Sequence, residues 1–187
     1  MYKINGHKLL QYPGELEELI VIFTNEGVKS YLEIGCKFGG SLWQVGRSLP
    51  RGSTIVGVDL MLYPDIYTRL QDAAADLTGQ KVHLIRGDST NRNIVRDVEK
   101  LGPFDACLID GNHTLPYVKK DWENYGPMCR LVAFHDINWS RSAIERGQMR
   151  IDYQIDVPQF WNGIKKDYRH IEIKKDKQDN GIGVLWR

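Results

Sequence analysis

The distribution of apolar residues along the chain predicts a sheet of buried parallel strands. Five short apolar runs each end in a glycine or an acid, and they lack the clean alternation of a strand with one wet face. Runs of this kind are typical of strands that are buried on both faces. They are "SYLEIG" at 30–35, "TIVGVD" at 54–59, "VHLIRGD" at 82–88, "DACLID" at 105–110 and "LVAFHD" at 131–136.

Amphipathic stretches separate these strands. Apolar residues recur in them three to four positions apart, and Gly79, Gly102 and Gly126 fit helix ends. Repeated alternation of strand and helix predicts an α/β fold, with a doubly wound, mostly parallel sheet and right-handed crossovers. The predicted helices between the strands cover residues 41–49, 65–79, 93–102 and 117–126.

The flanking segments complete a single domain over residues 1–187. An N-terminal region, residues 1–27, contains a predicted helix at 14–27, and residues 138–157 have no strong period and predict a loop or lid near the site. A helix is predicted at 157–168, followed by two antiparallel strands within 170–186 that a charged tip, "KKDKQD", connects.

Composition excludes several classes of partner. The chain has 187 residues, 42% of them hydrophobic and 26% charged, with a net charge of +1. It therefore lacks the basic excess of proteins that bind nucleic acid or anionic membranes. No apolar run approaches a membrane span of about 20 residues or a signal peptide. Cys36, Cys107 and Cys129 form no C-x-x-C pair, which favours free thiols and a cytoplasmic protein.

An acid lies at or near the end of every predicted parallel strand. In an open α/β sheet, ligands bind outside the carboxyl ends of the strands. Because like charges repel, carboxylates that gather at one edge need cations or hydroxyl donors to meet them. We therefore predict a binding site built around Glu33, Asp59, Asp88, Asp110 and Asp136.

The glycine loop "YLEIGCKFGGSL" at 31–42 narrows the choice of ligand. Its spacing is neither G-x-G-x-x-G nor the phosphate loop, and Glu33 would repel a pyrophosphate. A sulfonium ligand with an amino-acid end and an adenosine fits better, so we predict S-adenosylmethionine. Asp59 would bind the ribose hydroxyls and Asp88, beside Ser89, the adenine amine. Helix capping is the alternative role for both aspartates.

Several motifs in order resemble those of the class I S-adenosylmethionine-dependent methyltransferases. They are "YLEIGCKFGGSL", "VGVDL", "RGDST", "FDACLIDGNHT" and "LVAFHDI", and they run from about residue 28 to 137, with "GIGVL" at 181–185 resembling a last strand. The nearest branch contains cephalosporin-hydroxylase-like proteins and macrolide and rhamnose sugar O-methyltransferases. The resemblance implies a Rossmann-like seven-stranded sheet, ordered 3-2-1-4-5-7-6 with strand 7 antiparallel.

The resemblance also implies roles for individual residues. His113 would be the catalytic base beside Asp110, and Mg²⁺ would be held by Asp110 and Asp136, with His135 where the branch often has a glutamate. The predicted cofactor-binding residues are Glu33, Gly35, Cys36, Lys37, Phe38, Gly39, Gly40, Ser41, Asp59, Leu60, Gly87, Asp88, Ser89 and Asp110.

The implied function is O-methylation of a small-molecule hydroxyl. Two alternatives are a protein that binds S-adenosylmethionine for another activity or as a non-catalytic partner, and a nicotinamide-dependent oxidoreductase, which would need the missing G-x-G-x-x-G. Only residues 1–14 and 138–157 are left to cover an acceptor. Either the acceptor is small or exposed, or a second copy of the chain completes the site as a homo-oligomer.

Overall fold

The computed structural model describes residues 2–4, 6–9, 11–139, 154–174 and 180–187. Most of the predicted lid at 138–157 and of the charged tip at 174–179 therefore lies outside the described residues. None of the helices in the described residues combines the length and the apolar composition that a membrane-spanning helix needs.

Seven strands form the main sheet. Their order across the sheet is β5-β4-β3-β6-β7-β9-β8, and β9 runs antiparallel to both of its neighbours while β3 to β7 are parallel. This confirms the predicted order with an antiparallel seventh strand. The strands are β3 (Ser30–Ile34), β4 (Thr54–Asp59), β5 (Lys81–Arg86), β6 (Phe104–Ile109), β7 (Cys129–His135), β8 (Arg169–Ile173) and β9 (Ile182–Trp186).

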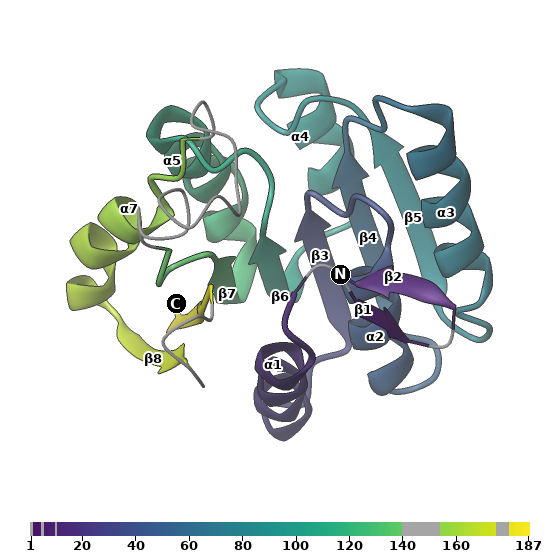
Figure 1. The fold of residues 1–187 in the computed structure, drawn as a ribbon, viewed down its shortest axis with the longest axis horizontal. Coiled ribbons are helices and arrows are strands. Elements are labelled where there is room, and N and C mark those ends of the chain that lie inside the picture. The colour runs from purple at the N-terminus through teal and green to yellow at the C-terminus, as the bar shows by residue number, and fades with distance from the viewer. Residues whose placement is uncertain (1, 5, 10, 140–153, 175–179) are drawn as a thin grey trace.

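Helices cover both faces of the sheet (Figure 1). One apolar core lies between the sheet and α1, α2 and α3, and a second lies between the sheet and α4, α5 and α7. Alternate residues of each strand enter alternate cores, which explains the apolar runs without alternation. The helices are α1 (Pro13–Asn25), α2 (Gly40–Ser48), α3 (Pro64–Ala75), α4 (Arg92–Glu99), α5 (Leu115–Tyr125) and α7 (Val157–Ile164), with 3-10 turns η1 (Gly126–Met128) and η2 (Lys165–Asp167).

Two predicted helices end a full turn earlier in the structure than the sequence pattern indicated. The helix predicted at 65–79 ends at Ala75, because the chain then turns so that the carbonyl of Gly79 accepts a hydrogen bond from the amide of Gly52 at 2.7 Å. The helix predicted at 157–168 ends at Ile164 and tightens into η2 before β8. Neither difference moves a residue of the predicted site.

Residues 2–4 and 7–9 form an element that the sequence pattern did not predict. β1 (Tyr2–Ile4) and β2 (His7–Leu9) make an antiparallel hairpin beside α2 (Figure 1). The His7 ring packs on Trp43 with centroids 4.7 Å apart, and its Nε2 lies 2.8 Å from the Asp76 carboxylate. The hairpin thus bridges α2 and the end of α3, and it brings the N-terminal segment to the carboxyl edge of the sheet.

Candidate functional site

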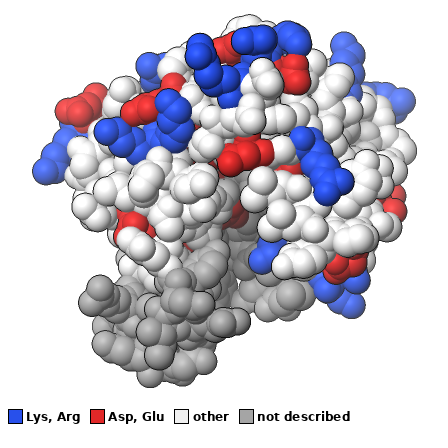
Figure 2. All heavy atoms as spheres, turned by 90° about the horizontal axis from the view of Figure 1, so that it is seen from above, with Lys and Arg blue, Asp and Glu red and all other residues white. Residues whose placement is uncertain are grey.

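Two cavities open at the edge where the parallel strands end. Figure 2 looks down on this edge and shows a hollow with acidic side chains at its rim. The first cavity, of about 650 Å³, lies over the ends of β3, β4 and β6, and the second, of about 340 Å³, lies between the glycine loop, β7 and the N-terminal segment. Both meet at β3 and β6, where the strand order reverses, which is the usual ligand position in such sheets.

The first cavity contains one half of the predicted site. Asp59, at the end of β4, fixes the loops around it by accepting hydrogen bonds from the amides of Lys37 at 2.8 Å and Met61 at 2.6 Å. Because a carboxylate has about four acceptor positions, Asp59 keeps two for a ligand. Of the predicted cofactor-binding residues, those that line this cavity are Gly35, Lys37, Asp59, Leu60, Asp88, Ser89 and Asp110.

The loop that contains Asp88 is held in place by its own side chains and by α5. Oδ1 of Asp88 accepts from the amide and hydroxyl of Thr90 at 2.8 and 2.7 Å, while the Tyr125 hydroxyl donates to the Ser89 carbonyl at 2.7 Å. Asn91, not Asp88, caps α4, by accepting from the amide of Asn93. Capping of that helix therefore does not account for Asp88, whose side chain lines the first cavity.

An apolar lip that the sequence analysis did not single out completes the first cavity. Leu62 and Tyr63 line it although they are 66% and 61% exposed, and Ile66 of α3 lies behind them. Large apolar side chains at such exposure around a concave site are suited to a flat ligand such as a nucleobase. The apolar run directly after Asp59, "LMLY", was the signal that could have indicated them.

The three glycines of the loop are required by neighbouring parts of the protein. A Cβ at Gly35 would lie 2.2 Å from the Asp110 carbonyl oxygen, one at Gly39 would lie 2.8 Å from Cβ of Ala73, and one at Gly40 would lie 2.1 Å from the Lys8 carbonyl oxygen. Gly35 and Gly39 also have φ values of 86° and 76°, which favour glycine. The spacing G-x-x-x-G-G thus follows from packing against β6, α3 and the N-terminal hairpin.

Gly39 and Gly87 lie outside both cavities. Gly39 is the residue before α2, and a Cβ at Gly87 would lie 2.4 Å from Cδ1 of Ile94. Cys36 lines the second cavity, where burial raises the pKa of its thiol well above the usual value. The thiol points to the carbonyls of Glu33 and Val58, and these contacts are those of a structural cysteine.

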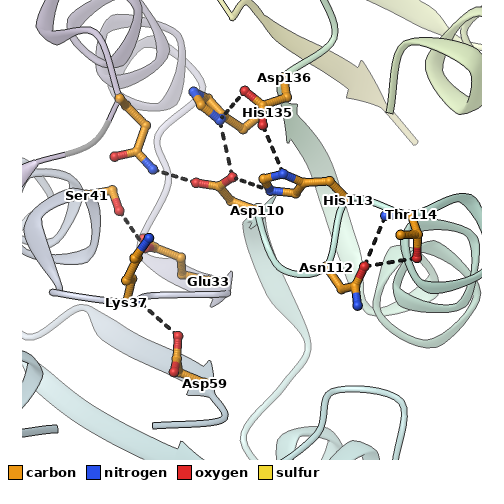
Figure 3. Close-up of polar contacts among 11 residues, drawn as sticks. Glu33, Lys37, Ser41, Asp59, Asp110, Asn112, His113, Thr114, His135 and Asp136 are labelled. Carbon is orange, nitrogen blue, oxygen red and sulfur yellow. Dashed lines mark hydrogen bonds and ion pairs between the residues drawn. The ribbon is translucent and has the colours of Figure 1, made fainter. Parts of the chain in front are cut away.

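Glu33 lies beneath the glycine loop and lines neither cavity. It is fully buried and accepts hydrogen bonds from the Tyr31 hydroxyl at 2.7 Å and the Ser41 hydroxyl at 2.6 Å (Figure 3). Burial raises its pKa to about 8, despite these two donors. The expectation of a Glu33 charge facing a cationic ligand therefore needs correction: this carboxyl is largely neutral at pH 7 and holds α2 against β3.

The second cavity brings together residues from distant parts of the chain. Lys8 and Gln11 come from the N-terminal segment, Phe38 and Ser41 from the glycine loop, and Asn180 from the segment before β9. Gln11 is 5% exposed, and its Nε2 donates to Oδ2 of Asp110 at 2.5 Å. The predicted site residues that line this cavity are Gly35, Cys36, Lys37, Phe38, Gly40, Ser41, Asp110, His113, His135 and Asp136.

Two carboxylates and two imidazoles form a cluster in which Asp110 and His113 line both cavities, while His135 and Asp136 line the second. Nε2 of His113 is 3.3 Å from Oδ1 of Asp110, and its Nδ1 is 3.1 Å from Oδ2 of Asp136. Nδ1 of His135 lies 3.2 Å from Asp110 and 3.1 Å from Asp136. Both imidazoles thus turn toward the Asp110 carboxylate (Figure 3). Asp136 has a φ of 64°, an uncommon conformation for a non-glycine residue that occurs preferentially at functional sites.

Mutual attraction within this cluster shifts the pKa values of Asp110, His113 and His135. Burial would lower the pKa of both imidazoles, but the carboxylates of Asp110 and Asp136 raise them, that of His135 well above its usual value. Burial would raise the pKa of Asp110, and the neighbouring His135 and His113 lower it instead. The cluster is thus a charged network held in a nearly dry site, where such interactions are strong.

The donor set of the cluster fits a divalent cation. Asp110, His113 and Asp136 each offer one ligand atom, and these atoms lie within 4.8 Å of one another. Two carboxylates and one imidazole suit Mn²⁺, Fe²⁺ or Zn²⁺ as well as Mg²⁺, which prefers oxygen. The metal ligands expected from the sequence were Asp110, Asp136 and His135, so His113 stands here in the place of His135. Nε2 of His135 is buried and has no hydrogen-bond partner among the described residues.

The sequence matches a known family, and its fold matches solved enzymes. Residues 32–137 match the model of a family described as "Methyltransferase domain". No curated protein sequence matches the chain.

Many solved structures are similar in fold, and three of them illustrate the likeness. An O-methyltransferase from Bacillus cereus in complex with SAH has a TM-score of 0.71 and 17% identity, over 97% of this chain and 83% of that one. The O-methyltransferase TomG from Streptomyces achromogenes, in complex with SAM, has a TM-score of 0.63 and 15% identity, over 98% and 82%. A methyltransferase from Geobacter sulfurreducens has a TM-score of 0.64 and 15% identity, over 94% and 79%. With the family match over more than half of its length, the chain belongs to the methyltransferase-domain family, within the class I S-adenosylmethionine-dependent methyltransferases.

Proposed function

We propose that the protein transfers a methyl group from S-adenosylmethionine in the first cavity to a hydroxyl of a small acceptor in the second cavity. The observation that carries this proposal is the wall common to both cavities, which consists of Gly35, Lys37, Asp110, Gly111 and His113. Methyl transfer is an in-line displacement, so donor and acceptor must meet across one short boundary. The solved O-methyltransferases of similar fold support oxygen as the acceptor atom.

In this proposal the first cavity binds the cofactor through its acids and its apolar lip. Asp59 accepts from the ribose hydroxyls, Asp88 and Ser89 bind the adenine edge, and Leu62 and Tyr63 cover the adenine ring. Among the described residues that line this cavity, the acids Asp59, Asp88 and Asp110 outnumber the one lysine, Lys37. That charge balance suits a ligand with a sulfonium and an ammonium group.

His113 is proposed as the general base. The acceptor oxygen forms a bond to the methyl carbon, the electrons of the broken carbon–sulfur bond return to sulfur, and the hydroxyl proton passes to the His113 imidazole. The product is then S-adenosylhomocysteine. Asp110, 3.3 Å away, orients the ring and stabilises the imidazolium that forms.

Asp110 and Asp136 would hold a divalent cation, and His113, whose ligand atom lies within 4.8 Å of theirs, keeps the role of base. The cation would supply Lewis acidity that lowers the pKa of the acceptor hydroxyl. The protein residues themselves hold the acceptor oxygen beside His113 and keep water out, since His135 and Asp136 are 5% and 3% exposed.

Calorimetry and a labelled-methyl assay test the proposal. S-adenosylmethionine with a tritiated methyl group is offered with a panel of sugars, phenols and peptides that bear hydroxyls, with and without Mg²⁺. We expect cofactor binding and label transfer to at least one acceptor. His113→Ala should keep the cofactor affinity within about twofold and lower the transfer rate by about 10²–10⁴-fold, the usual contribution of a general base.

The matched control is His83→Ala, because His83 is exposed on β5 and lies outside both cavities. This variant should change neither the cofactor affinity nor the transfer rate. Equal loss of binding and rate in His113→Ala would contradict the role of base. Cofactor binding without transfer to any acceptor would favour the non-catalytic alternative, and binding of NAD in place of S-adenosylmethionine would favour an oxidoreductase.

A further inference from the structure

The second cavity has two lysines on the side of the glycine loop. Nζ of Lys8 lies 4.8 Å from the centroid of the Phe38 ring, and Nζ of Lys37 lies 5.8 Å from the same centroid. Both residues line the cavity. Two cations that share one aromatic ring repel each other, and the ring itself compensates only about 0.5–1 kcal/mol for each at an exposed site.

Neither ammonium forms an ion pair with a carboxylate of the described residues. In the part of the chain that the structure describes, no carboxylate oxygen lies within 4.0 Å of Nζ of Lys8 or of Lys37. By contrast, Nζ of Lys165 lies 2.6 Å from a carboxylate oxygen of Glu172 and forms an ion pair with it. An anion between the two ammoniums would relieve their repulsion.

The backbone holds these two lysines in place. The carbonyl of Lys8 lies against Gly40, where any Cβ would be 2.1 Å away, so the backbone of the hairpin packs directly on the glycine loop. Lys37 has a φ of 46°, and its amide donates to Asp59 at 2.8 Å. The two lysines are therefore brought to one place by the same contacts that shape both cavities.

The carboxylates of the second cavity would not repel an anion bound beside Lys8 and Lys37. Asp110 and Asp136 lie with His113 and His135, each carboxylate within 3.3 Å of both imidazoles. In Figure 3, Lys37 lies on the side of Glu33 and Ser41, while the imidazoles lie beyond Asp110. The cavity thus has a lysine end and an imidazole–carboxylate end.

We propose that the methyl acceptor is a small hydroxy acid, whose carboxylate binds Lys8 and Lys37 while its hydroxyl reaches His113. Asn180, on the same cavity, offers an amide for a further hydrogen bond. The volume of about 340 Å³ is near the lower end for small-molecule sites, so an acid with one ring fills it. This inference rests on the proposed function, since it places the acceptor in the second cavity.

Binding of an acid and its neutral isostere tests the inference without requiring turnover. The probes are 3-hydroxybenzoate and 3-hydroxybenzamide, titrated by calorimetry into the protein loaded with S-adenosylhomocysteine. We expect the acid to bind at least about tenfold more tightly, because hydrogen bonds to charged groups are worth about 1.5–3 kcal/mol. Added salt should reduce this preference.

Lys8→Met and Lys37→Met remove the charges and keep an unbranched side chain beside Phe38. Each should lower the preference for the acid, and the double variant should abolish it, while Lys119→Met, on the exposed face of α5, should leave it unchanged. Equal binding of acid and amide, no binding of either, or a preference that survives the double variant would overturn the inference. Failure of the proposed function looks different, as loss of cofactor binding or of methyl transfer with every acceptor.

Discussion

The first and second cavities share a wall, but the chain builds them in different ways. The first is made largely by residues at or just after the ends of consecutive strands, such as Asp59 after β4 and Asp88 after β5. The second needs Lys8 and Gln11 from one end of the chain and Asn180 from the other. A fold shared by many methyltransferases can thus keep one cavity constant and vary the other through its terminal segments.

The two cavities also differ in charge. Asp59 and Asp88 make the first cavity acidic, whereas Lys8 and Lys37 give the second a cationic end. Only the common wall, with Asp110 and His113, belongs to both. The difference predicts that substitutions of residues that line only one cavity separate cofactor binding from acceptor chemistry.

The largest expected effect is on cofactor affinity. Asp59→Ala should weaken S-adenosylmethionine binding about 100-fold, because two hydrogen bonds from the ribose to a carboxylate are lost at about 1.5 kcal/mol or more each. Asp136→Asn, in the second cavity, should leave that affinity within about threefold. Calorimetry with both variants measures the difference between their affinities for S-adenosylmethionine.

Asp59→Asn serves as the control for this test. It keeps one carboxylate-like oxygen for the amide of Lys37 or Met61, so a smaller loss than in Asp59→Ala is expected. Circular dichroism would verify that each variant is folded. Equal weakening by Asp59→Ala and Asp136→Asn would mean that the two cavities act as one binding site.

Sequence reasoning found the residues at the strand ends in both cavities, but it missed those that the terminal segments add to the second cavity, for a physical reason. An apolar run that ends in an acid is a local signal, and it correctly indicated Asp59, Asp88, Asp110 and Asp136 as cavity residues. The contact between Gln11 and Asp110 spans 99 positions and has no local signal. Three-residue strands such as β1 and β2 are also too short for a period to be recognised.

The placement of Glu33 was predictable, although the analysis of the loop did not predict it. Residues two apart in a strand point to the same face, so Glu33 must lie with Tyr31 on the side covered by α1 and α2. That rule gives a buried carboxyl beneath the loop. The neighbouring glycines instead favoured the interpretation that a charged Glu33 faces the ligand. Packing against Lys8, Ala73 and Asp110 explains those glycines.

A smaller effect is expected from substitution of Gln11, which should change the methyl-transfer rate and leave cofactor affinity unchanged. Gln11→Ala frees Oδ2 of Asp110, so the carboxylate that orients His113 can turn away. The methyl-transfer rate should fall about tenfold, consistent with the loss of one hydrogen bond to a charged group, while cofactor affinity stays within about twofold. Steady-state rates with the acceptor identified by labelled-methyl transfer, together with calorimetry, measure both quantities.

Two further variants sharpen this result. Gln11→Glu places a second carboxylate against Asp110 and should lower the rate more than Gln11→Ala does. Gln159→Ala, on the exposed side of α7, should change nothing. An unchanged rate in Gln11→Ala would show that the N-terminal segment only encloses the second cavity and does not orient its chemistry.

The smallest expected effect concerns stability and a carboxyl beneath the first cavity. Asp121 of α5 is fully buried, 3.5 Å from where a Cβ of Gly111 would lie. Burial raises its pKa from 3.8 to about 7, a contact with Ser89 opposes the shift, and the charge of Asp88 adds to it. Between about pH 4 and 7 the folded protein therefore keeps this proton while the unfolded chain has lost it.

Because the folded state then binds more protons, its stability falls as pH rises through this window, by at most about 1.4 kcal/mol per pH unit, and levels off above about pH 7. Asp121→Asn should remove that part of the slope in urea unfolding curves taken from pH 4.5 to 8. Glu33, whose pKa of about 8 gives a slope of the same sign, remains in both proteins, so only their difference reports on Asp121. Identical slopes in the two proteins would place the ionised form of Asp121 in the folded state, and the floor of the first cavity would then carry a further negative charge beside Asp88.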